Sequence, residues 1–125
     1  MHFVVDAMNV IGSRPDGWWR DRRGAIEKLV AQLDRWASRS GVEEVTAVLE
    51  KPPSPPLEAA VTKIAWAPRP GPDSADAEIL SRLDVWLAEG EVTVVTSDRE
   101  LAAGARSLGA GVQPSSEFRR LLDSL

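Results

Sequence analysis

The sequence Glu-Val-Thr-Val-Val-Thr-Ser-Asp occupies residues 91–98, and its first six residues are the clearest β-strand pattern in the chain. Short runs of Val and Thr of this kind are typical of strands buried inside a sheet. Weaker patterns of the same type occur on both sides of it. The expected strands are residues 2–6, 43–50, 61–67, 91–96 and 111–113.

Helical periodicity separates most of these strands. Apolar residues recur three and four positions apart in residues 22–39, and Gly41 and Gly90 are natural helix ends. Strands that alternate with helices imply right-handed crossovers, and therefore a parallel sheet covered by helices on both faces. The expected helices are residues 22–39, about 74–89, 99–108, and from about 115 onward. The expected loops are residues 7–21 and the proline-rich segment 52–56, and the residues expected in the core include Trp36, Trp66 and Trp86.

Composition limits the classes of function that are open to this chain. A length of 125 residues fits one domain, residues 1–125, and 43% apolar residues are enough for a packed core. The absence of Cys excludes disulfides and thiolate chemistry, and a Ser-His-Asp triad would have to rest on His2 alone. No segment reads as a signal peptide or a membrane span, so we expect a cytoplasmic protein.

Carboxylates follow the ends of the expected strands. Asp6, Glu50 and Asp98 end three of them, and Asp76 begins the helix that follows a fourth. The carboxyl ends of parallel strands meet at one edge of a sheet, where ligands bind in open α/β folds. Asp76 also shares a helical stripe with Leu80 and other apolar residues, so its side chain is expected to point toward the sheet.

Each of these acids also has a purely structural interpretation. Asp6 could bond the backbone of a turn, Asp98 could cap the following helix, and Asp76 could interact with a helix dipole whose cap is Asp73 or Ser74. Convergence of several carboxylates on one edge favours a different role, because clustered carboxylates repel one another and require a cation. Ligands that are all oxygen suit Mg²⁺ or Mn²⁺.

Arginine and tryptophan are concentrated in residues 14–23. The formal net charge of −4 argues mildly against a nucleic-acid partner, but aromatic rings stack on unpaired bases and arginine binds phosphate. The alternative is that Trp18 or Trp19 packs beneath this loop and that the arginines pair with Asp16 and Asp21. The expected substrate contacts are Arg14, Trp18, Arg20, Arg22 and Arg23, together with Arg99 beside Asp98.

Four segments of the sequence together resemble the YacP-like branch of NYN domains, which belong to the PIN-like nuclease superfamily. They are VVDAMNVIG at 4–12, SADAEI at 74–79, VVTSDREL at 94–101 and SSEFRRLL at 115–122. The resemblance covers nearly the whole chain. It implies a PIN-like three-layer α/β/α sandwich with a parallel sheet, and a divalent-metal-dependent ribonuclease activity.

The resemblance also implies roles for particular residues. Asp6, Asp76 and Asp98 match the metal-binding acids of the family, and Asn9 and Ser97 match its supporting polar positions. The resulting hypothesis is hydrolysis of single-stranded RNA by water that Mg²⁺ or Mn²⁺ activates, leaving a 5′-phosphate and a 3′-hydroxyl. The catalytic set expected for this reaction is Asp6, Asn9, Glu50, Asp76, Ser97 and Asp98.

Two departures from the family pattern keep an alternative open. Ala77 stands where the family often has a second Asp, and Glu50 stands where it tends to have Asp. The alternative is a non-catalytic RNA-binding or ribosome-associated module of the same fold. A phosphoaspartyl phosphatase or receiver domain fits poorly, because residue 8 is Met where the phosphatase pattern needs Asp, and residues 91–115 contain no Lys. The sequence leaves the oligomeric state open.

Overall fold

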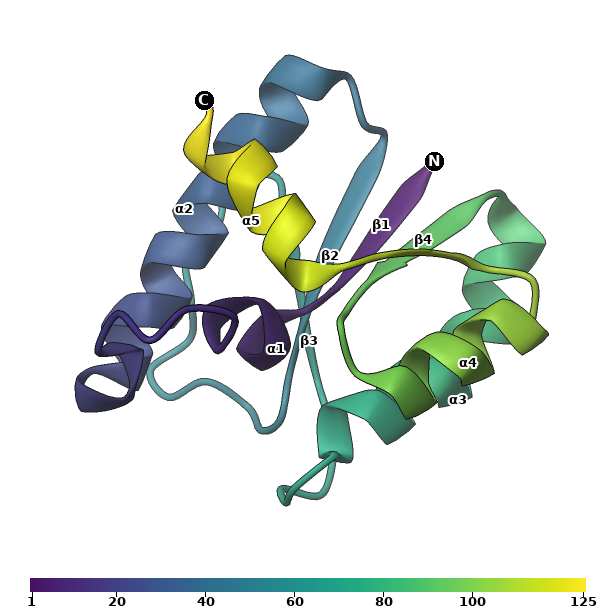
Figure 1. Cartoon of the computed structure of the whole chain (residues 1–125), viewed down its shortest axis with the longest axis horizontal. Coiled ribbons are helices and arrows are strands. Elements are labelled where there is room, and N and C mark those ends of the chain that lie inside the picture. The colour runs from purple at the N-terminus through teal and green to yellow at the C-terminus, as the bar shows by residue number, and fades with distance from the viewer.

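A five-stranded parallel sheet forms the middle of the molecule (Figure 1). The structure is a computed structural model that describes residues 1–125. Every neighbouring pair of strands is parallel, in the order β3-β2-β1-β4-β5. The strands are β1 (His2–Asp6), β2 (Glu44–Leu49), β3 (Lys63–Trp66), β4 (Val92–Val95) and β5 (Gly111–Gln113).

Helices cover both faces of this sheet. Three of them lie on one face and two on the other (Figure 1), which confirms the expected three-layer α/β/α architecture. The first group is α1 (Ala7–Ile11), α2 (Arg22–Ser40) and α5 (Ser115–Asp123), and the second is α3 (Ser74–Glu89) and α4 (Arg99–Ser107). None of these helices is both long enough and apolar enough to span a lipid bilayer.

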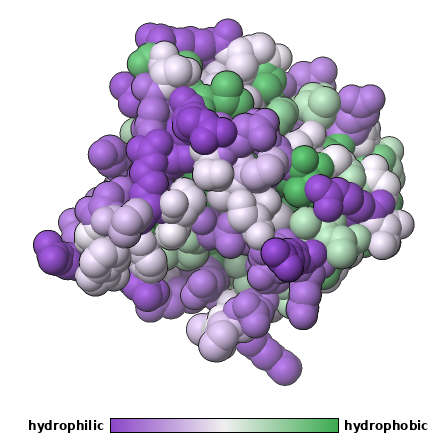
Figure 2. Space-filling model, in the orientation of Figure 1, coloured by the Kyte–Doolittle hydropathy of each residue, from purple (hydrophilic) through white to green (hydrophobic).

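Side chains of β1 point alternately to the two faces of the sheet and contribute to two separate layers of the core. Val5 packs with Phe118 and Leu33 in the layer beneath α1, α2 and α5, whereas Val4 packs with Ile79 beneath α3 and α4. Successive strand residues point to opposite faces, so one apolar run serves both layers. The face seen in Figure 2 is mainly hydrophilic, with hydrophobic groups in small patches.

The order of the strands places a switch point between β1 and β4. From β1 the chain moves outward through β2 to β3, then returns to the other side of β1 and continues to β5. The two directions diverge at the adjacent carboxyl ends of β1 and β4, where open α/β sheets leave a crevice. Val5 pairs with Val95, so the residues that follow them reach this crevice side by side.

Two expectations about local structure were wrong. Residues 7–21 are not all loop, because α1 and a short 3₁₀ turn, η1 (Trp18–Arg20), form within them. The Arg119 guanidinium donates to the carbonyl oxygens of Val10 and Ile11 at 3.1 and 3.4 Å, and so stabilises the end of α1 from α5. Trp66 is 41% exposed because β3 is an edge strand.

The proline-rich segment between β2 and β3 has no regular secondary structure, as expected, yet it is held against α2 at two places. The Arg23 guanidinium donates to the carbonyl oxygens of Pro55 and Pro56. Farther along, the Asp34 carboxylate accepts the backbone N–H groups of residues 60, 61 and 62 and the hydroxyl of Thr62. Burial alone would raise the pKa of Asp34, but these hydrogen bonds hold it below its usual range.

Replacing Asp34 with Ala should lower the free energy of unfolding by about 2 kcal/mol, because hydrogen bonds to a charged group are lost. The native carboxyl has a depressed pKa, so its contribution is present at neutral pH and disappears as the pH falls through the folded-state pKa. Urea unfolding at several pH values measures both effects. Asp84→Ala, an exposed change on α3, is the control, and equal stability of the two variants would contradict the prediction.

Candidate active site

A cleft of about 230 Å³ opens at the switch point and contains five carboxylates. Strand ends, the start of α3 and the 3₁₀ turn all contribute to its walls. The residues that line it are Asp6, Met8, Asn9, Trp18, Arg22, Glu50, Asp73, Ala75, Asp76 and Asp98. Four of the expected acids therefore converge, as their positions at strand and helix ends indicated.

Asp6 is the most buried of these acids. It ends β1, and its side chain is only 4% exposed. The Thr96 hydroxyl donates to its Oδ2 at 3.0 Å and in turn accepts the backbone N–H of Asp98 at 3.1 Å. These bonds join the ends of β1 and β4. Thr96 was not among the expected site residues, although it directly precedes the Ser-Asp pair at the strand end.

The second acid, Asp76, points toward Asp6 from the first turn of α3. The two carboxyl groups lie close enough to share a hydrogen bond. Burial raises the pKa of Asp6 to about 7, and the negative charge of Asp76 adds to the shift. Burial also raises the pKa of Asp76 to about 6, with a further contribution from the charge of Asp98. Near neutral pH this pair therefore needs a proton or a cation between its oxygens.

Asp73 also joins the cluster, although it was not among the expected site residues. One carboxylate oxygen from each of Asp73, Asp76 and Asp98 lies within 4.8 Å of the others. Asp73 precedes α3 with a φ of 61°, but its side chain makes no capping bond. Ser74 does not cap the helix either, since its hydroxyl donates to the Glu50 carbonyl at 3.0 Å. The only indication of this in the sequence is that Asp73 is a second acid, three residues before Asp76.

Asp98 has a structural role as well as a place in the cluster. Its Oδ1 accepts the backbone N–H of Leu101 at 2.8 Å, which makes it the N-cap of α4. A carboxylate has two oxygens, so capping leaves acceptor capacity for a second partner. The capping interpretation is therefore correct without excluding a ligand role.

Asn9 and Ser97 connect three elements around the cleft. The Asn9 Oδ1 accepts the Ser97 backbone N–H at 2.8 Å and the Ser115 hydroxyl at 2.5 Å. The Ser97 hydroxyl accepts the backbone N–H of Ser115 at 2.9 Å. This network joins α1, the turn after β4 and the start of α5. Ser97 itself does not line the cleft, and Ser115 is a buried member of the network that was not among the expected site residues.

Some of the expected substrate-binding residues reach the cleft. Trp18 and Arg22 line it, and the Arg22 guanidinium lies 5.3 Å from the centre of the Trp18 ring. Arg99 lines an adjoining groove with Asp76 and Asp98 on the α4 side. Trp18 is half-buried and Trp19 is 51% exposed, so neither ring belongs to the buried core.

The remaining arginines of residues 14–23 lie elsewhere. Arg14 forms an ion pair with Asp123, and Arg23 contacts Glu27 in addition to the proline carbonyls. Arg20 lies 6.0 Å from the Trp19 ring. The alternative pairing of these arginines with Asp16 and Asp21 is wrong. Asp16 binds Arg119, and Asp21 accepts the backbone N–H of Gly24 as the N-cap of α2.

The side chains of the cleft fit a divalent ion. Their donors are carboxylate oxygens, three of which lie close enough together to share one ion. Burial is the main cause of the raised pKa values of Asp6 and Asp76, and the charges of the neighbouring carboxylates add to it. The single histidine lies at the other end of β1, where His2 Nε2 is 2.8 Å from the Thr46 hydroxyl. It takes no part in this site.

Replacing Asp6 with Asn should change how stability depends on pH in metal-free protein. The folded-state pKa of Asp6 is about 7, whereas the unfolded value is about 4. The folded wild type therefore holds a proton that the unfolded chain releases, and it loses stability as the pH rises through this range. The stability of Asp6→Asn relative to the wild type should therefore increase as the pH rises from about 4 to about 7. Urea unfolding in EDTA measures this, and a difference independent of pH would contradict it.

Comparison with known proteins identifies the fold. No family model and no curated protein matches the chain. The crystal structure of Rae1 (YacP) from Bacillus subtilis superposes with a TM-score of 0.81 at 19% identity, over 99% of this chain and 74% of Rae1. A mutant of the same protein gives 0.79 at 19% identity, over 98% and 75%. The fold implied by the sequence motifs is confirmed, and this chain has the fold of Rae1 (YacP).

Proposed function

We propose that the chain is a divalent-metal-dependent ribonuclease that hydrolyses phosphodiester bonds in single-stranded RNA. The observation that carries this proposal is the convergence of Asp6, Asp73, Asp76 and Asp98 at the switch point of the sheet. The Rae1 fold and the motifs that resemble YacP-like NYN domains support the same assignment. We assign the chain to that family on these combined grounds.

Asp6, Asp76 and Asp98 are the proposed ligands of Mg²⁺ or Mn²⁺, and Asp73 is an additional candidate. A bound divalent ion supplies an activated water and neutralises charge on the scissile phosphate. Ala77 removes a carboxylate that the family pattern often has, but Asp73 brings another to the same cluster. The acidic cluster therefore does not depend on position 77.

The other residues of the site orient these ligands and the strand. Thr96 fixes Asp6 by its hydrogen bond, while Asn9 and Ser97 hold the turn that carries Asp98. Glu50 lines the cleft and is the proposed group that positions water. Trp18 offers a ring for stacking on an unpaired base. The proposed products carry a 5′-phosphate and a 3′-hydroxyl.

Arg22 is the strongest candidate for a phosphate contact. It lines the cleft, and its side chain forms no ion pair with a carboxylate. Arg99, which lines the adjoining groove, remains a proposed contact, and so do Arg14, Arg20 and Arg23, which lie outside the cleft. The net charge of −4 does not oppose RNA binding once a cation occupies the acidic cluster.

Saturating Mn²⁺ or Mg²⁺ should raise the melting temperature of the wild type, because an ion that binds only the folded state stabilises it. At one hundred times the dissociation constant the gain is about 2.7 kcal/mol. Asp76→Asn should lose most of this gain, whereas Asp84→Asn should keep it. Thermal unfolding with and without the ion tests the prediction, and an unmoved wild-type melting temperature would count against a metal site.

Asp98→Asn separates the capping role of this residue from the catalytic one. Asn retains an oxygen that can accept the Leu101 N–H, so the helix should remain capped. Loss of the charge should lower the rate of cleavage of single-stranded RNA in Mn²⁺ by at least about 100-fold. Even mutation of a residue that only hydrogen-bonds to a metal ligand lowers metal affinity or activity by about 10–100-fold. The measurement is the rate of cleavage of an end-labelled single-stranded RNA.

Two controls accompany this variant. Asp21→Asn makes the same change at the N-cap of α2, outside the acidic cluster, and shows what capping alone contributes to stability. A metal-free melting curve shows whether Asp98→Asn is folded. Wild-type cleavage by folded Asp98→Asn would exclude the proposed mechanism. RNA binding by the wild type without any cleavage would support the non-catalytic RNA-binding module instead.

A further inference from the structure

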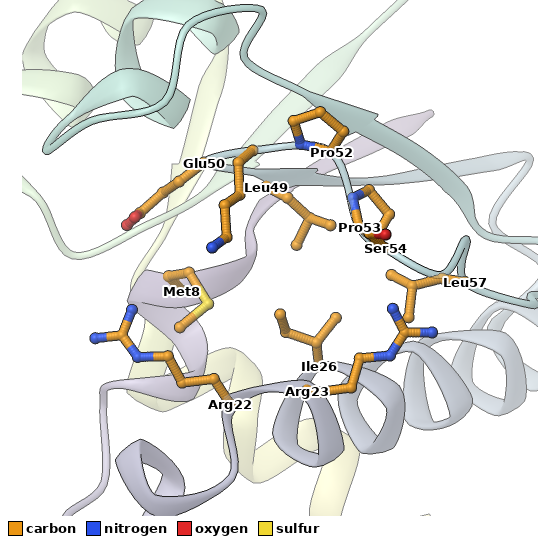
Figure 3. A pocket seen from close by; sticks show the side chains of 11 residues that line it. Met8, Arg22, Arg23, Ile26, Leu49, Glu50, Pro52, Pro53, Ser54 and Leu57 are labelled. Carbon is orange, nitrogen blue, oxygen red and sulfur yellow. The ribbon is translucent and has the colours of Figure 1, made fainter.

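A second pocket, of about 290 Å³, lies beside the acidic cleft (Figure 3). Its inner surface is apolar, with Met8 and Ile26 facing Leu49 and Leu57 across the cavity. Met8, Arg22 and Glu50 line both hollows, so the pocket and the cleft are neighbours along one surface. The proposed hydrolysis uses Arg22 and Glu50, which lie where the two hollows meet, but not the apolar interior of this pocket.

One wall of the pocket is the proline-rich segment that follows β2. Pro52, Pro53 and Ser54 face the cavity (Figure 3). The segment is held against α2 by Arg23 on one side and by Asp34 farther along. Proline has little backbone freedom to lose, and the anchored segment keeps the pocket in place before a ligand arrives. The pocket is therefore preorganised.

Positive charge lies at the edge of this apolar surface. Arg22 and Lys51 both line the pocket, are exposed, and form no ion pair with a carboxylate. An apolar hollow next to unpaired cations is complementary to a ligand that carries a flat ring beside an anion. A nucleotide has this combination, since its base is flat and largely apolar on its faces and its phosphate is negative.

We infer that this pocket receives one unpaired base of the RNA strand, adjacent to the phosphate that lies at the acidic cleft. The inference rests on the proposed function and adds a binding subsite to it. The volume is just below the range of about 300–1,000 Å³ for small-molecule sites, which suits one base and not two stacked bases. Arg22 and Lys51 contact the phosphates that flank this base.

The test measures binding without cleavage. An oligouridylate and the same strand without bases are compared by fluorescence anisotropy, using Asp98→Asn protein in Mn²⁺. The ratio of the two dissociation constants reports what the bases contribute, while the backbone charge is the same in both strands. Leu57→Trp places a large side chain in the pocket, and Leu108→Trp makes the matched change at the half-exposed C-cap of α4.

Filling the pocket should lower the base contribution by about tenfold, because the base loses its apolar contacts with Met8, Ile26 and Leu49. Leu108→Trp should leave the contribution unchanged. An equal contribution in both tryptophan variants overturns the inference. A variant that remains folded is required, so each protein is first checked by thermal unfolding.

Lys51→Ala supplies a second test, because its exposed side chain can be removed without disturbing the core. It should weaken binding of both strands equally and reduce the log–log salt slope by about 0.7. Arg39→Ala, an exposed change in the last turn of the same helix that carries Arg22, is the control. An unchanged slope for Lys51→Ala overturns the placement of a phosphate at the pocket mouth.

These results are independent of the nuclease assay. A base contribution that depends on the pocket, without cleavage by the wild type, overturns the nuclease proposal and keeps the binding subsite. If the wild type cleaves RNA and filling the pocket does not change the base contribution, the nuclease proposal is kept and the binding subsite is overturned. The two proposals therefore fail in different experiments.

Discussion

Repulsion among carboxylates at the ends of β1 and β4 is the constraint on which the rest of this site depends. Asp6 is buried with almost no access to water, and Asp76 and Asp98 bring further negative charge close to it. A cluster of this kind is costly unless protons or cations share it. The fold does not relieve it with a lysine or arginine ion pair, since no basic side chain pairs with these acids.

Hydrogen bonds hold the repelling groups in place. Thr96 donates to Asp6, and the network of Asn9, Ser97 and Ser115 joins the two strand ends to α5. Each of these partners is neutral, so the network fixes geometry without cancelling the charge. The carboxylates are therefore held in a fixed geometry and keep their negative charge, and both features favour the binding of a hard divalent ion.

Charge is separated along the surface that would meet RNA. The carboxylates occupy the cleft, whereas Arg22 and Lys51 lie beside it without acidic partners. An anionic strand would thus meet free cations near the cleft and a cation-bound cluster within it. Trp18 and Met8 also line the cleft, and Met8 continues into the neighbouring pocket, so apolar groups lie beside the charged ones on this surface.

The periodicity of apolar residues in the sequence was enough to predict the main strands and helices, because these patterns are local. The position of the acids also followed, because the carboxyl ends of parallel strands share one edge of the sheet. The parallel sheet and the convergence of Asp6, Asp76 and Asp98 follow from that. Tertiary structure alone decided that α1 forms, that Trp66 is exposed, and that Asp73 enters the cluster. These outcomes depend on contacts distant in sequence, on which strand lies at the edge, and on a left-handed backbone conformation. Local patterns contain none of that information.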